Sequence, residues 1–214
     1  MCRDAVGKEI WANLLIEDSV LSITIPQDYL DNAVYPLTLD PTFGVTSVGA
    51  SEGADYANQM EGFLVTTPSD ISSVSKLSLY SKAAADIFFK TGIWLKGGGT
   101  THALISNGVG GIGDPGTSWA WVDSTFSTPP APASSTEHII GIVVSDMVYW
   151  KYDHISGYTN YWHPENSYSA PGSLVNPQLG PDVYIMSLYA TYSAGSALAF
   201  PPLFSRRQNT LLRR

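Results

Sequence analysis

The sequence predicts an all-β fold: a jelly-roll β-sandwich with an N-terminal β-hairpin extension and an irregular C-terminal tail. Short apolar runs alternate with turn sequences such as Gly97-Gly98-Gly99 and Pro171-Gly172 over most of the chain, and this regular punctuation is typical of sandwiches. The 214 residues include 19 Gly and 14 Pro, a content of turn-forming residues that disfavours an all-α protein.

The N-terminal region predicts a β-hairpin followed by a short helical turn. Residues 10–17 and 20–25 are apolar-rich runs separated by Asp18-Ser19, a spacing typical of a hairpin. Pro26 ends the second run, and residues 27–32 suit one turn of helix before a strand at 35–39. We therefore divide the chain into residues 1–42 (hairpin and linker strand), 43–192 (jelly-roll sandwich) and 193–214 (basic tail).

The central region predicts a series of short strands. We expect them near 45–49, 58–66, 73–81, 85–95, 101–106, 118–127, 137–145, 147–153, 158–163 and 182–192. Residues 108–113, Gly-Val-Gly-Gly-Ile-Gly, match the dinucleotide-binding fingerprint in spacing, but that fingerprint must open a helix. Because Asp114-Pro115-Gly116 follows and forms a turn instead, we interpret 108–113 as a flexible connection between strands.

The distribution of charge excludes several classes of partner. Residues 5–205 contain six Lys, no Arg and 18 Asp plus Glu, a net of −12, while Arg206, Arg207, Arg213 and Arg214 lie in the tail. Nucleic-acid binding needs clustered basic residues, so we expect no nucleic-acid partner. The longest apolar stretch, 139–144, is far short of the ~20 residues of a membrane span, so we expect no membrane insertion.

The sequence predicts no catalytic residue. The four histidines lack the His-Glu-x-x-His spacing of a metalloprotease. Acidic pairs such as Asp146 with Asp153, or Asp123 with Glu137, are compatible with β-sandwich glycoside hydrolases, but a chain with 19 acidic residues yields such pairs by chance.

Aromatic residues concentrate between residues 149 and 168. Flat rings with polar edges suit stacking on sugars, and this reasoning selects Trp150, Tyr152, Tyr158, Tyr161 and Trp162 as candidate glycan ligands. Two other interpretations stay open: these rings fill the core and cover the sandwich edge, or they form a subunit interface.

Two stretches resemble domains of known proteins. Residues 21–26 (Leu-Ser-Ile-Thr-Ile-Pro), followed by 29–42 with Tyr-Pro-Leu-Thr-Leu-Asp-Pro-Thr at their end, resemble a junction that leads into β domains of bacterial and phage surface proteins. Trp119-Ala120-Trp121-Val122, Val148-Tyr149-Trp150 and residues 184–192 are similar to the carbohydrate-binding-module-like jelly rolls of phage structural and prokaryotic surface proteins. The resemblance implies adhesion, glycan binding or assembly, and often a structural calcium ion held by Asp side chains and loop carbonyls.

The tail suggests contacts between subunits. Its apolar and basic residues would be exposed if free, and opposite charges on tail and body favour head-to-tail docking. The candidate interface residues are Leu198, Phe200, Phe204, Arg206, Arg207, Arg213 and Arg214.

From these observations we expect a non-enzymatic structural or adhesive subunit of an extracellular or virion assembly (a fibre, filament or shell decoration), forming a homo-oligomer or filament through its terminal segments. The alternative is a carbohydrate-binding module, free or cut from a larger surface protein or enzyme, with a polysaccharide as ligand. A glycoside hydrolase or lyase on the same fold is a third interpretation.

Overall fold

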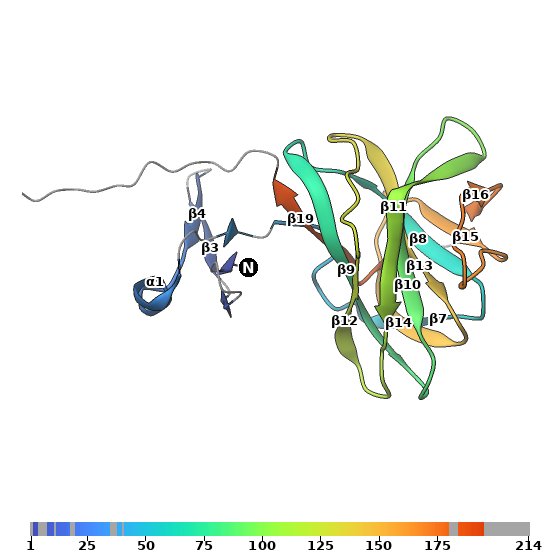
Figure 1. Ribbon diagram of the computed structural model, residues 1–214, viewed down its shortest axis with the longest axis horizontal. Helices are drawn as coiled ribbons and strands as arrows, with labels where there is room; N and C mark the ends of the chain where they lie inside the picture. Colours follow the sequence, from blue (N-terminus) through green and yellow to red (C-terminus); the bar gives the residue numbers. More distant parts are fainter. Residues whose placement is uncertain are drawn as a thin grey trace, which may run out of the picture.

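The computed structural model describes residues 2–3, 8–10, 12–17, 20–34, 38–39, 41–179 and 184–194. Strands β3 (Asn13–Glu17) and β4 (Val20–Thr24) form the predicted hairpin, and helix α1 (Gln27–Asn32) is the predicted helical turn. Strands β1 (Cys2–Arg3), β2 (Glu9–Ile10) and β5 (Thr38–Leu39) make a small antiparallel sheet. Figure 1 shows this N-terminal region to one side of the remaining strands.

The rest of the described chain forms two curled antiparallel sheets. The first sheet has the order β16 (Leu174–Val175), β11 (Thr101–Gly113), β10 (Phe89–Leu95), β13 (Glu137–Val144), β8 (Met60–Thr66), β15 (Asn160–His163) and β17 (Gln178–Leu179). The second sheet has the order β18 (Tyr184–Met186), β14 (Val148–His154), β9 (Ile71–Ala83), β19 (Leu188–Ala194) and β6 (Thr42–Gly44). Strand β12 (Ala120–Thr125) pairs with β9, and β7 (Ser51–Asp55) pairs with β14.

The all-β sandwich that the sequence predicts is therefore confirmed (Figure 1). Jelly-roll connectivity stays a prediction, because the strand order establishes two antiparallel sheets and no more. Two local predictions are wrong: residues 45–49 connect β6 to β7, and 84–88 form a turn before β10. Asp86 has a φ of 62° there, a left-handed conformation that ends a strand.

Residues 108–113 belong to strand β11 and are not a flexible connection. Glycine usually weakens a strand, but here it permits close packing. A Cβ at Gly110 would overlap the hydroxyl oxygens of Thr91 and Ser124, and one at Gly113 would overlap the ring of Phe89. The hydroxyl of Ser124 donates to the carbonyl of Gly111 at 2.6 Å, which joins β12 to β11.

Most of the hydrophobic core lies between the two sheets. The first sheet is buried on both sides. Along strand β13, successive side chains point alternately into the core between the sheets and into a smaller core on the outer side of the first sheet. Ile140, Ile142 and Val144 face the second sheet, whereas Ile139 and Val143 face outward. A continuous apolar run is typical of a strand buried on both faces.

A smaller second core covers the outer side of the first sheet. It consists of Met60, Trp94, Ile139, Val143, Tyr161 and Leu174. The indole Nε1 of Trp94 donates to the carbonyl of Gly172 at 2.8 Å, and the side-chain amide of Asn166 bonds the same glycine in both directions. These bonds hold the segment 164–175 over the outer side of the first sheet.

Candidate functional site

The outer side of the second sheet carries side chains that alternate with the core residues of strand β9. Leu77 and Leu79 are fully buried between the sheets, so the neighbouring even-numbered residues face outward. Tyr80 is paired with Trp121 of β12, and Lys82 is paired with Tyr149 of β14. Residues directly opposite on antiparallel strands share a side of the sheet, so these pairs lie together on one surface.

We call this surface the aromatic face and define it by Tyr80, Trp119, Trp121, Tyr149 and Tyr189. All five side chains are half-buried. The rings of Tyr80 and Trp119 stack with centroids 5.7 Å apart and planes 6° apart. Trp121 meets Tyr80 edge-on at 5.4 Å and Tyr189 edge-on at 5.0 Å. Four of the rings thus form a continuous row across β12, β9 and β19.

Lysine side chains border these rings. The Nζ atoms of Lys82 and Lys151 each lie 4.7 Å from the ring centroid of Trp119, and Lys82 lies 5.2 Å from that of Tyr149. Ammonium groups at this distance are attracted to the ring face. The Glu52 carboxylate lies 3.6 Å from both ammonium groups.

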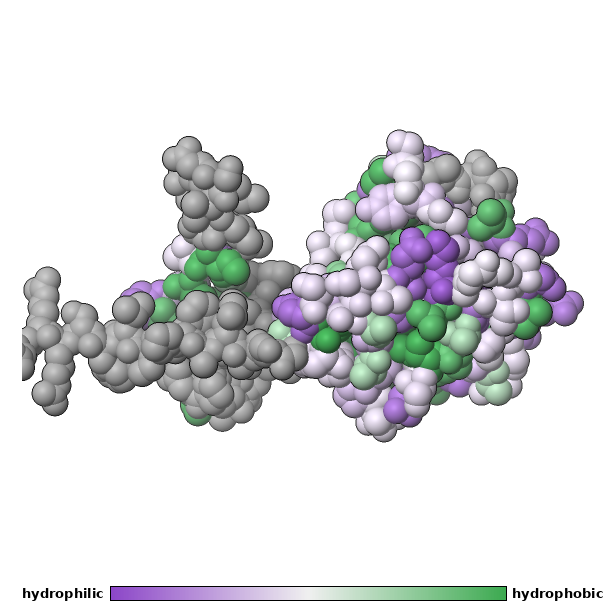
Figure 2. All heavy atoms as spheres, turned by 90° about the horizontal axis from the view of Figure 1, so that it is seen from above, coloured by the Kyte–Doolittle hydropathy of each residue, from purple (hydrophilic) through white to green (hydrophobic). Residues whose placement is uncertain are grey.

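Charged side chains also border the aromatic face on the other side of Tyr80, and together with Lys82, Lys151 and Glu52 they form its polar rim. Asp123 accepts from the Nζ of Lys76 at 2.7 Å and from the hydroxyl of Ser78 at 2.6 Å. Flat rings bordered by charged hydrogen-bonding groups are the combination that stacks on sugar rings and bonds their hydroxyls. Figure 2 shows the molecule from above the view of Figure 1; the sandwich surface on this side is largely of intermediate hydropathy, with a hydrophobic patch beside a hydrophilic one.

The five glycan ligands predicted from the sequence do not lie on one surface, and two of them are core residues. Trp150 is 4% exposed and packs between the sheets, and Tyr161 is 5% exposed and packs in the second core. Tyr152 contacts the rings of Trp150 and Tyr184. Trp162 is half-buried in β15, paired with Glu61 and Gln178. The spacing of the rings along the chain could not separate these environments.

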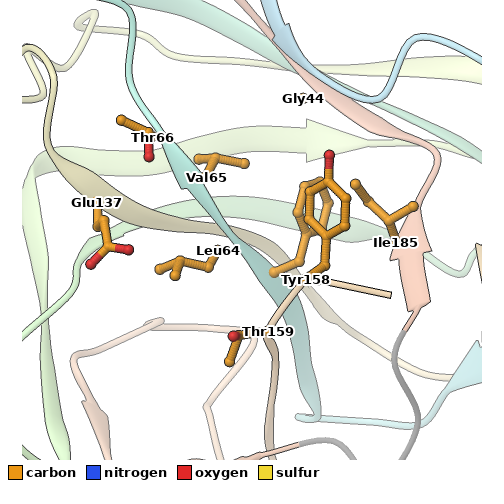
Figure 3. Close-up of a pocket in the computed structure, with 10 residues that line it drawn as sticks. Gly44, Leu64, Val65, Thr66, Glu137, Tyr158, Thr159 and Ile185 are labelled. Atoms are coloured by element: carbon orange, nitrogen blue, oxygen red, sulfur yellow. The ribbon is translucent and has the colours of Figure 1, made fainter. Parts of the chain in front are cut away.

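Tyr158 alone of the five is strongly exposed, at 41%, and it lines a cleft of about 410 Å³ (Figure 3). Phe63 also lines the cleft. Figure 3 shows Ile185 beside Tyr158 on one side, and Val65, Thr66 and Glu137 on the other. The Phe63 and Tyr158 rings meet edge-on at 6.4 Å. The Glu137 carboxylate is paired with Lys96 at 2.7 Å. None of the residues that line the cleft belongs to the aromatic face.

A pair of carboxyl groups is buried between the sheets. Asp55 is 3% exposed and Glu61 is 4% exposed. The indole Nε1 of Trp150 donates to Asp55 at 2.8 Å, and the hydroxyl of Tyr184 donates to Glu61. Burial raises the pKa of Asp55 to about 7, and burial together with the nearby Asp55 raises the pKa of Glu61 to about 9. Burial therefore favours the protonated form of both carboxyl groups.

Two sequence patterns with catalytic potential, residues 49–53 and the acidic pair Asp123 and Glu137, take part in structural pairings. Residues 49–53 read Gly-Ala-Ser-Glu-Gly, the spacing of a hydrolase nucleophile, but Ser51 begins β7 and pairs with Tyr152 instead of standing on a strand-to-helix turn. Asp123 and Glu137, on different sheets, each pair with their own lysine. Within the described ranges, no three His, Cys, Asp or Glu side chains group closely enough to hold a metal ion.

The aromatic face was missed by the sequence analysis. The signal was present in Trp119-Ala120-Trp121 and in the alternation of Lys76, Ser78, Tyr80 and Lys82 with buried leucines. The predicted interface residues Leu198, Phe200, Phe204, Arg206, Arg207, Arg213 and Arg214 lie outside the described residues.

No helix in the part of the chain that the structure describes is long and apolar enough to cross a membrane. No protein-family model, curated protein or solved structure matches this chain.

Proposed function

We propose that this protein is a non-enzymatic adhesive β-sandwich module that binds polysaccharide through the aromatic face. The observation that carries the proposal is the row of rings in which Trp119 stacks on Tyr80 and Trp121 joins Tyr80 to Tyr189. The four rings come from three neighbouring strands and one adjoining residue, so a rigid sheet positions them.

The chemistry of this surface favours sugar over a purely apolar partner. Each ring is half-buried, and Lys76, Lys82, Lys151, Glu52 and Asp123 border the row. Sugar rings present both C–H faces, which stack on aromatic rings, and hydroxyls, which need charged or polar partners. The acidic residues of this rim are engaged by lysines, which favours a binding role over acid–base catalysis.

Affinity electrophoresis in gels containing individual polysaccharides tests this proposal. We expect wild-type protein to be retarded by at least one polysaccharide, and Trp119→Ala or Trp121→Ala to weaken binding at least ~10-fold, because aromatic anchors dominate binding energy. Tyr158→Ala is the matched control, since Tyr158 is an exposed ring outside the aromatic face. Retention of both Trp variants equal to wild type, or no retention on any polysaccharide, would refute the proposal.

We further propose that the module is a subunit of an extracellular or virion assembly, held to its neighbours by terminal segments. The support is the sequence: a tail with Leu198, Phe200 and Phe204 followed by four arginines, on a body of net charge −12. Opposite charges on the tail and the body favour head-to-tail contacts, and a head-to-tail contact that does not close produces a filament.

A further inference from the structure

The lysines of the sandwich are concentrated on the aromatic face. Residues 41–194 contain five lysines and 12 acidic residues. Three of the five, Lys76, Lys82 and Lys151, border the aromatic rings, where two acidic residues, Glu52 and Asp123, face them. A third acidic residue on this side of β14, Asp153, accepts a hydrogen bond from the backbone N–H of Ala50 at 2.8 Å.

Two of these lysines are less fully paired than the other lysines of the sandwich. Lys76 and Lys96 lie 2.7 Å from carboxylates, and Lys90 lies 3.1 Å from the carbonyl oxygen of Tyr168. Lys82 and Lys151 instead share Glu52 at 3.6 Å, beyond the usual length of a charge-assisted hydrogen bond.

The same two ammonium groups lie beside the ring that carries the proposed function. Each is 4.7 Å from the ring centroid of Trp119, and the Lys82 and Lys151 side chains are 30% and 21% exposed. An anionic group at this position would meet two cations within reach of one aromatic ring. A carboxylate attached to a sugar ring has the required shape, because the ring stacks while its carboxylate extends to the side.

We propose that the aromatic face selects an acidic polysaccharide: a uronic acid ring packs on the row of rings while its carboxylate is bound by Lys82 and Lys151 beside Trp119. This inference rests on the proposed glycan binding and adds the chemical class of the ligand. The uronate replaces or joins Glu52 as the anion between the two lysines, and the charge pairing supplies selectivity against neutral sugars.

The test compares each acidic polysaccharide with the same chain after full methyl esterification, which removes the charge and keeps the sugar. Polygalacturonate and alginate are the probes, each in acid and ester form, with affinity electrophoresis and calorimetry as readouts. We expect the wild type to bind one acid form roughly 3- to 10-fold more tightly than its ester, the range that two exposed ion pairs provide.

The variants separate charge from stacking. The Lys82→Gln/Lys151→Gln double variant should lose the preference for the acid form, and Lys82→Arg/Lys151→Arg should keep it. Trp119→Ala should abolish binding of both the acid form and the ester form. Circular dichroism and thermal unfolding check that each variant is folded. If the glutamine variant lost its preference only because Trp119 had moved, other changes at Lys82 and Lys151 should disturb binding too. The arginine variant, which changes both side chains but keeps their charge, tests for this.

Three outcomes overturn the inference: equal binding of acid and ester forms, an unchanged preference in the glutamine variant, or binding of neutral polysaccharides alone. In each of these the proposed glycan binding survives. Failure of the wild type to bind any polysaccharide, acidic or neutral, overturns the proposed function itself.

Discussion

The indole Nε1 of Trp150 donates a hydrogen bond to Oδ2 of Asp55 at 2.8 Å, and both residues are at least nine-tenths buried. Asp55 lies at the end of β7, directly beside β14, which carries Trp150. Gly53 pairs with Trp150 on the same strands, and a Cβ there would lie 2.7 Å from the indole. The glycine makes room for the ring, and the ring nitrogen satisfies the buried carboxyl group.

We predict that Asp55 and Glu61 contribute a stability that falls as pH rises from ~4 to ~9. In the unfolded chain Asp and Glu ionise near pH ~4, whereas burial raises the folded-state pKa of Asp55 to about 7 and that of Glu61 to about 9. Between these values the folded protein binds more protons than the unfolded chain, so stability is greatest at the acid end and is lost towards the folded-state pKa values.

Urea unfolding midpoints measured from pH 4 to pH 9 test this dependence. The Asp55→Asn/Glu61→Gln double variant should have a flatter profile, because neither amide ionises and each retains an oxygen that accepts the existing bond. Asp86→Asn, at an exposed turn, is the control and should keep the wild-type profile. A double variant as pH-dependent as wild type would show that other groups cause the loss.

We predict that Trp150→Phe destabilises the sandwich by ~1–3 kcal/mol. Phenylalanine keeps an aromatic ring but removes the Nε1 donor, which leaves the buried Asp55 oxygen without its partner. The loss should be larger at pH 9 than at pH 5, since the indole bond holds the pKa of Asp55 down. Chemical denaturation at both pH values measures it, and an equal loss at both would contradict the role of the bond.

We predict that Gly110→Ala costs more than ~2 kcal/mol of stability. The new Cβ would overlap the hydroxyls of Thr91 and Ser124 and disturb their 2.9 Å hydrogen bond. Gly98→Ala is the matched control, because a Cβ at Gly98 meets no atom within 4 Å and surface changes usually stay within about 0.5 kcal/mol. Thermal unfolding of both variants compares the two sites, and similar melting temperatures would refute close packing of β11 on β12.

We predict that removal of residues 198–214 yields a folded but unassembled protein. This deletion takes away the apolar and arginine residues that we propose as subunit contacts. Light scattering at micromolar concentration should report assemblies for the full chain and monomers for the truncated one. Raising salt from ~0.05 to ~0.5 M shortens the screening length from ~14 to ~4 Å and should weaken the full-length assembly. A truncated chain that assembles normally would contradict the docking of this tail.

The sequence by itself determined the properties that depend on neighbouring residues along the chain. The alternating and continuous apolar runs predicted the sandwich strands. Two further runs predicted the hairpin strands β3 and β4, and residues 27–32 formed the expected helix. Continuous apolar residues 139–144 form a strand buried on both faces. Local spacing sets these features, because periodicity and turn residues act within a few positions.

Only the tertiary structure decided which side of each strand is exposed and which distant residues meet. Alternation says that Trp150 and Tyr152 share a side of β14, but pairing with β7 and β9 and packing on the first sheet place that side in the core. Likewise, Trp121 lies beside Tyr80 because β12 pairs with β9 some 40 positions away in sequence. Burial of Glu61 near Asp55 follows from sheet packing as well. Such contacts join segments far apart in the chain, so no local pattern contains them.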